Sequence, residues 1–326
     1  MIRRLLGSSG IEVSLLGLGC NSLGHIPPQE AERLVMAALD HGVSFFDTAN
    51  VYAQGDSEKE LGRLISRSSH DVLIATKFGH PSSVPSGQAP CAPEQVFAAV
   101  DASLGRLRRD TIDVLLIHFP DPRTPVVETL SALSTLLQQG KIRSYGVSNF
   151  SPAQLDELVQ AADSLAMPRP ILVQDEYSLL RRAVETTLIP QVLAYELGFV
   201  PFFPLASGLL TGAYRQGQTP DFALRAKIVR RFEERFFLEE HWIALEALHA
   251  LSDCAAIPLN QIALHWLASR PAVTTIIAGA STSAQFLANA QALATPVPAD
   301  VLQAVDRVLA ELALASASEE GGQRIS

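Results

Sequence analysis

The feature that most constrains this fold is a regular alternation between short apolar runs and amphipathic stretches of helical period. It starts near residue 14 and continues to about residue 293. The apolar runs, rich in Val, Ile and Leu, are predicted strands. They lie at residues 15–19, 44–47, 72–76, 112–118, 144–148, 171–175, 199–204 and 273–278. The predicted helices between and after them are 28–40, 57–66, 93–107, 125–138, 151–164, 185–197, 239–254 with 259–269, and 283–293.

Eight strand–helix units in one chain favour a closed (β/α)8 TIM barrel. The reason is that strands apolar throughout must be buried on both faces. An open eight-stranded sheet with helices on both sides is the alternative. Residues 1–13 predict a short hairpin before the barrel, and a helix at 299–313 is an addition after it. We therefore expect a single domain over residues 1–313 and a disordered tail over 314–326.

Charge and composition exclude several kinds of partner. The net charge is −9 and the pI about 5.4, which opposes a nucleic-acid surface. Apolar runs are too short for a membrane span, and the first residues are too short for a signal sequence, so we expect a cytoplasmic protein. Cys20, Cys91 and Cys254 lack metal-ligand spacing and are predicted to be reduced thiols. The sequence does not indicate whether the protein is a monomer or a homo-oligomer.

Polar side chains stand where three consecutive predicted strands end. Asp47, Lys77 and His118 occupy these positions, and Tyr52 follows Asp47 in the same loop. In a parallel barrel all such ends meet at one rim, so the four groups should lie together. Taken singly, each has an ordinary structural explanation, such as a turn former, a solvated strand end or a core imidazole. We expect no metal here, because a lysine in the cluster would repel a cation.

The four groups together suit proton transfer. A tyrosine has a pKa of about 10, and an adjacent ammonium lowers it. Lys77 is placed to do this for Tyr52, with Asp47 holding Lys77 in its charged form. His118 would then hydrogen-bond a substrate oxygen or the tyrosine hydroxyl.

The chain resembles the aldo-keto reductase family over about residues 1–295. The resemblance lies in FFDTANVY (45–52), GDSE (55–58), ATK (75–77), LIH (116–118), GVSNF (146–150), VQ (173–174) and PLASG (204–208). HFPD (118–121) and LASGLLTG (205–212) are similar to the bacterial type of oxidoreductase in this family. The resemblance implies an eight-stranded barrel that uses a nicotinamide cofactor to reduce aldehydes or ketones. It favours NADP(H) over NAD(H) as that cofactor.

Site residues follow from the resemblance position by position. It makes Tyr52 the proton donor, with Lys77 and Asp47 setting its pKa and His118 orienting the substrate. It assigns the nicotinamide and pyrophosphate contacts to Ser148, Asn149, Gln174, Phe202, Leu205 and Ser207. Phe202 stands where the family usually has a tyrosine that stacks on the nicotinamide, and a phenyl ring can also stack.

The adenosine end departs from the family pattern. The resemblance places the 2'-phosphate and adenine contacts at Gly279, Ser281, Thr282, Gln285 and Asn289. Ser281 and Thr282 replace the basic residue often found there. Hydroxyls and helix amides can bind a phosphate, but without the charge of an arginine. A basic residue elsewhere, such as Arg215 or Lys227, is a candidate substitute.

Two other functions remain open at this stage. One is a non-catalytic NADP(H)-binding regulatory subunit of the same fold, as in channel subunits that resemble this family. The other is a hydrolase or isomerase that uses the same rim. Gly17, Gly19 and Gly24 lack the spacing of a dinucleotide fingerprint and are assigned to the first strand and its loop. Substrate specificity is expected from loops 78–92, 119–125 and 206–237.

Overall fold

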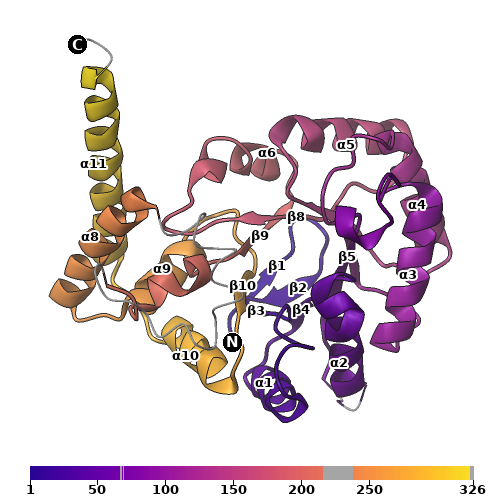
Figure 1. The fold of residues 1–326 in the computed structure, drawn as a ribbon, viewed down its shortest axis with the longest axis horizontal. Helices are drawn as coiled ribbons and strands as arrows, with labels where there is room; N and C mark the ends of the chain where they lie inside the picture. The colour runs from indigo at the N-terminus through magenta and orange to yellow at the C-terminus, as the bar shows by residue number, and fades with distance from the viewer. Residues whose placement is uncertain (67, 69, 216–237, 324–326) are drawn as a thin grey trace.

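The structure is a computed structural model that describes residues 1–66, 68, 70–215 and 238–323, without the side chains of 239, 240 and 314–323. Eight parallel strands form its centre (Figure 1). They are β3 (Leu16–Gly19), β4 (Phe45–Asp47), β5 (Leu73–Phe78), β6 (Val114–Ile117), β7 (Tyr145–Ser148), β8 (Leu172–Glu176), β9 (Gly198–Phe202) and β10 (Ile276–Gly279). The strands pair in chain order from β3 to β9, and β10 pairs with β3.

The sheet closes on itself between β9 and the residues before β10. Phe199 forms a parallel bridge with Val273. The Phe199 N–H donates to the Ala272 carbonyl at 3.0 Å, and the Thr274 N–H donates to the Phe199 carbonyl at 2.9 Å. The predicted (β/α)8 barrel is therefore confirmed, and the open-sheet alternative is wrong.

Helices surround the strands, as Figure 1 shows for α1 to α5. The helices are α1 (Pro28–Asp40), α2 (Asp56–Ile65), α3 (Pro93–Leu107), α4 (Val126–Gln138), α5 (Pro152–Ser164), α6 (Ile189–Ala194), α8 (Glu239–Ala255), α9 (Leu259–Ala268), α10 (Ser283–Ala294) and α11 (Ala299–Gln323). Proline starts α1 and α3 at the expected residues, because its fixed φ suits the first helical turn. Ser151 and Gln154 form a capping box at the start of α5.

Three expected elements differ from the structure. The helix expected at 185–197 is split into η3 (Ala183–Glu185) and α6, because Pro190 can occupy only the first turn of a helix. The last strand starts at Ile276 instead of residue 273. The boundary expected at residue 313 falls inside α11, whose Ala- and Glu-rich sequence favours helix up to Gln323.

The predicted amino-terminal hairpin forms from β1 (Arg3–Leu5) and β2 (Glu12–Ser14). Leu6 and Val13 are fully buried among side chains at the first positions of the barrel strands, including Phe45, Val114 and Leu172. The Arg4 guanidinium donates to the carbonyls of Val273 and Ala268, both at 2.7 Å. The hairpin thus closes the amino end of the barrel and leaves the carboxyl end as the mouth.

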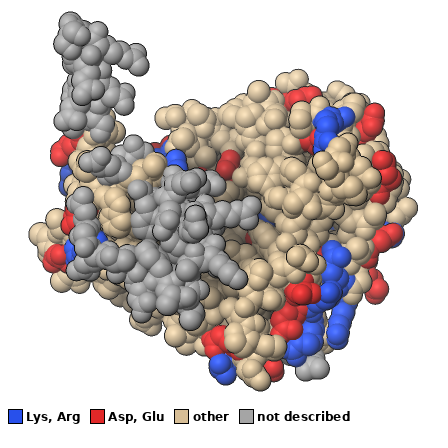
Figure 2. Space-filling model, in the orientation of Figure 1, with Lys and Arg blue, Asp and Glu red and all other residues tan. Residues whose placement is uncertain are grey.

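Charged side chains of both signs lie next to one another on the face in Figure 2. Several are neighbours on one helix, as in the pairs Arg63–Glu60 and Lys59–Asp56 on α2. Among the described residues, no single helix has the length and apolarity needed to cross a membrane. One pair of helices bent by 99°, His241–Ala255 with Leu259–Ala268, meets those criteria jointly on length and composition alone.

Candidate active site

The structure brings the four predicted acid/base groups together at the barrel mouth. Asp47 ends β4, Lys77 lies at the carboxyl end of β5, and His118 directly follows β6. Tyr52 begins η1 (Tyr52–Gly55), the turn that leads from β4 into α2. The Lys77 ammonium donates to both Asp47 carboxylate oxygens at 2.7 Å, to the Thr48 carbonyl at 2.8 Å and to the Tyr52 hydroxyl at 3.3 Å.

Lys77 is the centre of this network. Its side chain is 1% exposed, and burial lowers the pKa of an ammonium. The charge of Asp47 and the hydrogen bonds to Asp47 and Tyr52 outweigh burial, so the pKa of Lys77 lies above its ordinary value. The side-chain amide of Gln174 donates to Asp47 at 2.8 Å and fixes the carboxylate from a third strand. Lys77 therefore remains a cation next to the phenol.

The pKa of Tyr52 differs from the sequence-based expectation. Burial of its hydroxyl raises the pKa and is the largest effect, while the charge of Lys77 lowers it. The net direction is upward, so Lys77 only partly offsets burial. The phenol consequently keeps its proton at neutral pH, as a proton donor must.

His118 is enclosed by rings at the same mouth. Its imidazole lies 5.1 Å from the rings of His80 and Phe119 and 6.1 Å from the ring of Tyr52. Burial, Lys77 and His80 lower the pKa of His118 to about 2. Its Nδ1 atom has no hydrogen-bond partner among the described residues. His118 is thus a neutral imidazole that carries one ring N–H.

The residues predicted to hold a carboxamide form a connected group beside these four. The side-chain amide of Asn149 donates to the His118 carbonyl at 2.9 Å and to the Ser148 hydroxyl at 3.1 Å. Ser148 in turn lies 3.5 Å from the side-chain oxygen of Gln174. Asn149 has a φ of 60°, a left-handed conformation that asparagine tolerates better than most residues. Because Gln174 also contacts Asp47, this group is continuous with the acid/base network, which the sequence did not indicate.

The segment after β9 forms a strongly curved backbone. Phe202 ends β9, and Leu205 precedes η4 (Ala206–Thr211). Ser207 and Gly208 have φ values of 55° and 104° inside η4. Within this turn the Ala206 N–H donates to the Phe203 carbonyl at 2.9 Å and the Gly208 N–H to the Leu205 carbonyl at 2.8 Å. The pyrophosphate contact predicted for Leu205 and Ser207 stays a prediction.

The predicted adenosine contacts lie at the end of β10 and in the first turns of α10. Gly279 is the exposed last residue of β10, Gln285 is exposed and Asn289 is buried. Ser281 and Thr282 precede the helix, and both hydrogen-bond within this segment. Arg215 pairs with Asp253 at 3.5 Å, while Lys227 lies outside the described residues.

Sequence reasoning missed one residue here. Glu30 of α1 reaches the start of α10 and accepts a hydrogen bond from the Ser283 N–H at 2.7 Å. The two residues are far apart in the chain. They meet only because β10 pairs with β3 when the barrel closes, so no local pattern could have indicated the contact.

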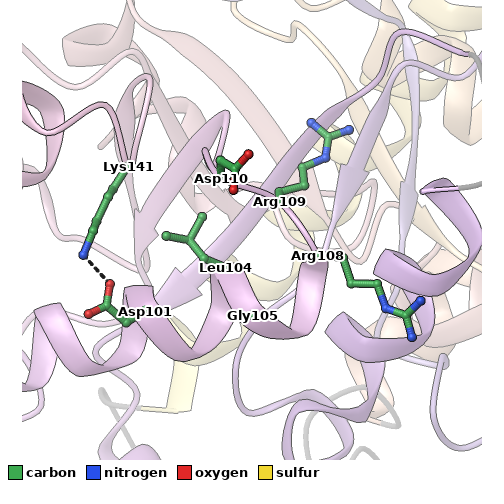
Figure 3. Close-up of a pocket in the computed structure, with 7 residues that line it drawn as sticks. All are labelled: Asp101, Leu104, Gly105, Arg108, Arg109, Asp110 and Lys141. Atoms are coloured by element: carbon green, nitrogen blue, oxygen red, sulfur yellow. Dashed lines mark hydrogen bonds and ion pairs between the residues drawn. The ribbon is translucent and has the colours of Figure 1, made fainter.

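Two hollows lie outside this network. A cavity of about 370 Å³ is bounded by the turn that carries Tyr52, by the 78–92 loop and by α3. Figure 3 shows a groove lined by Asp101, Arg108, Arg109, Asp110 and Lys141, with Lys141 paired to Asp101. That groove lies before β6 and β7, at the amino ends of the strands and away from the mouth. Among the described residues, no cluster of His, Cys, Asp or Glu could hold a metal ion.

A closed parallel barrel with Asp, Tyr, Lys and His converging at its mouth defines a class of barrel oxidoreductase. Comparison with known proteins agrees. The family model described as "Aldo/keto reductase family" matches residues 15–310. A solved aldo-keto reductase from Bacillus halodurans, in its holo form, superposes with a TM-score of 0.78 at 30% identity, covering 94% of this chain and 96% of that one.

Two sequence relatives carry different names. A probable voltage-gated potassium channel subunit beta from Arabidopsis thaliana is 33% identical over 92% of this chain and 95% of its own length. An L-glyceraldehyde 3-phosphate reductase from Escherichia coli K12 is 31% identical over 89% and 87%. The chain belongs to the aldo/keto reductase family. Membership supports an oxidoreductase that uses a nicotinamide cofactor.

Proposed function

We propose that the protein reduces an aldehyde or ketone to an alcohol with a nicotinamide dinucleotide. The observation that carries this proposal is the contact of the Lys77 ammonium with the Tyr52 hydroxyl at 3.3 Å and with Asp47 at 2.7 Å. This arrangement pairs a protonated phenol with a fixed cation next to it. The substrate is a small carbonyl compound, and a cytoplasmic location remains a prediction.

The residues at the mouth divide the work of the reaction. The nicotinamide supplies a hydride to the carbonyl carbon when it is bound. Tyr52 donates its proton to the carbonyl oxygen, and the ammonium of Lys77 stabilises the phenolate that remains. Asp47 keeps Lys77 charged and in place. The ring N–H of neutral His118 donates a hydrogen bond that orients the carbonyl oxygen.

Other residues would hold the cofactor. Ser148, Asn149 and Gln174 offer the polar groups that suit a carboxamide, and Phe202 offers an aromatic face. Leu205 and Ser207 would contact the pyrophosphate through the curved backbone of η4. Sequence resemblance alone favours NADP(H) over NAD(H).

Replacement of Tyr52 by phenylalanine tests the proposal. Tyr52→Phe should lower reduction of a nitrobenzaldehyde about a hundredfold or more, because the ring still packs but has no proton to give. Cofactor affinity, measured by fluorescence titration, should change little. Tyr145→Phe is the matched control. Tyr145 is the first residue of β7, away from the mouth, and its hydroxyl donates to the Pro168 carbonyl. Full activity in Tyr52→Phe would remove Tyr52 from the mechanism.

A second candidate is a non-catalytic regulatory subunit that binds the same cofactor. The similarity to a probable potassium channel subunit favours it. The complete set of four acid/base groups opposes it, because a binding subunit has no need of a proton donor. Turnover across a panel of aldehydes distinguishes the two: a parent protein no faster than Tyr52→Phe, with cofactor binding intact, would support the regulatory function.

A further inference from the structure

Backbone N–H groups at the amino end of α10 already donate hydrogen bonds to side chains of the protein. Glu30 accepts hydrogen bonds from the Ser283 N–H at 2.7 Å and from its hydroxyl at 3.1 Å. The side-chain oxygen of Gln285 accepts from the Ser281 N–H at 2.8 Å and from its hydroxyl at 3.0 Å. Thr282 accepts from the Gln285 N–H at 3.2 Å. The amides of Ser281, Ser283 and Gln285 therefore already have partners within the protein.

Glu30 also places a negative charge at this helix end. The Ser283 N–H and then Arg33 hold the pKa of the Glu30 carboxyl below its ordinary value. The carboxylate is thus ionised at neutral pH, and it lies where the helix dipole stabilises an anion. An anionic ligand group at the same amides would have to displace this carboxylate or lie next to it.

Arg33, a basic side chain on α1, is engaged by the same carboxylate. The Arg33 guanidinium donates to Glu30 from Nε at 2.9 Å and from a terminal nitrogen at 2.5 Å. A guanidinium paired with a carboxylate offers less charge to a phosphate than an unpaired one. Glu30 therefore disfavours phosphate binding in two ways. Its own negative charge repels a phosphate, and its ion pair with Arg33 reduces the positive charge available to one.

We propose that Glu30 is a specificity-determining residue that makes the adenosine end of the site select NAD(H) over NADP(H). The proposal rests on the function proposed above. A ribose 2'-hydroxyl can donate a hydrogen bond to a carboxylate, whereas a 2'-phosphate at neutral pH is repelled by it. The direction is opposite to the sequence-based expectation, which considered Ser281, Thr282 and the helix amides without their partners.

Binding titrations of the full chain with NADH and with NADPH test this preference. The parent protein should bind NADH at least about tenfold more tightly than NADPH at low ionic strength. Glu30→Gln keeps an oxygen that can accept from Ser283 but removes the charge and releases Arg33. It should shift the ratio of the two dissociation constants about tenfold toward NADPH, because NADPH binds more tightly and NADH, whose 2'-hydroxyl loses a charged acceptor, binds somewhat less tightly.

Glu32→Gln is the matched control. It removes the same charge from the same helix, but its carboxylate lies 3.8 Å from Arg63 on α2 and not at α10. The ratio should stay at the parent value. Competition by 2',5'-ADP against 5'-ADP gives a readout without the nicotinamide, and the same variant should improve binding of 2',5'-ADP only.

The outcomes separate this inference from the proposed function. Binding of neither dinucleotide would overturn both. Tight binding of both with an unchanged ratio in Glu30→Gln would reject the role of Glu30 and leave the reductase intact. A parent protein that prefers NADPH, with the preference lost in Arg33→Ala, would show that Arg33 leaves Glu30 to bind the phosphate. That result would overturn the inference whatever the Glu30→Gln variant shows.

Discussion

At the scale of single residues, the mouth of the barrel places a charged lysine close to a neutral histidine. Lys77 is charged because Asp47 and Tyr52 outweigh its burial, while His118 is neutral because burial and the nearby cation act in the same direction. The positions of these groups could be predicted, because each lies at a strand end. Their pKa values could not, since burial depends on neighbours that no local pattern indicates.

The pKa of His118 predicts how acid affects stability. An unfolded histidine takes up a proton below a pH of about 6.5, whereas folded His118 does so only near pH 2. Between these values the unfolded chain binds the extra proton, so stability falls as the pH falls. His118→Phe should remove this dependence. We expect the loss of unfolding free energy between pH 7 and pH 5 to be smaller in the variant by about 2 kcal/mol.

Urea unfolding at the two pH values measures this difference. His25→Asn is the control, because it removes a histidine from the exposed surface and not from the buried site. An equal loss in the parent and in His118→Phe would mean that His118 is protonated in the folded protein.

At the scale of elements, helix starts were predicted best where proline or a capping residue fixes the first turn. Pro28 and Pro93 start α1 and α3 as expected. Pro190 has the same property, but the apolar pattern continues through it and concealed the break between η3 and α6. Close packing between elements is harder to predict, because it depends on the backbone of the partner.

The contact between α2 and α3 gives a test at this scale. A methyl group on Gly62 would lie 2.6 Å from the backbone of Leu107, so Gly62→Ala should force the helices apart. We expect a loss of about 1–3 kcal/mol in unfolding free energy. Gly105→Ala on α3 is the matched control, since nothing lies within 4 Å of its added methyl. This change should stabilise the protein by about 0.5–1 kcal/mol, because alanine favours helix. Similar effects of both changes in thermal or urea unfolding would contradict the packing described here.

At the scale of the whole molecule, the number of strand–helix units predicted the barrel. Both residues of the closing Phe199–Val273 bridge lie at the first positions of predicted strands, but their register could not be predicted, because it depends on how the neighbouring strands pair. Contact between Glu30 and α10 is a consequence of the same closure. Function at the adenosine end therefore depends on pairing between the first and last parts of the chain.

The amino-terminal hairpin gives the prediction for the whole molecule. Leu6 is fully buried in the barrel interior, whereas Leu5 is 56% exposed on the same hairpin. Leu6→Ala should lower the unfolding free energy by about 2–5 kcal/mol, because it leaves a cavity in the core. Leu5→Ala should change it by less than about 0.5 kcal/mol. Equal midpoints for the two variants in urea would show that the hairpin does not contribute to the core.

The same hairpin has a consequence for the order in which two reactants can bind. Because the first residues of the chain close one end of the barrel, the described residues leave Tyr52 and Lys77 at the opposite, carboxyl end. Two reactants that bind there enter through the same mouth of the barrel. We therefore expect the reactant that binds deeper in the mouth to bind first and to leave last.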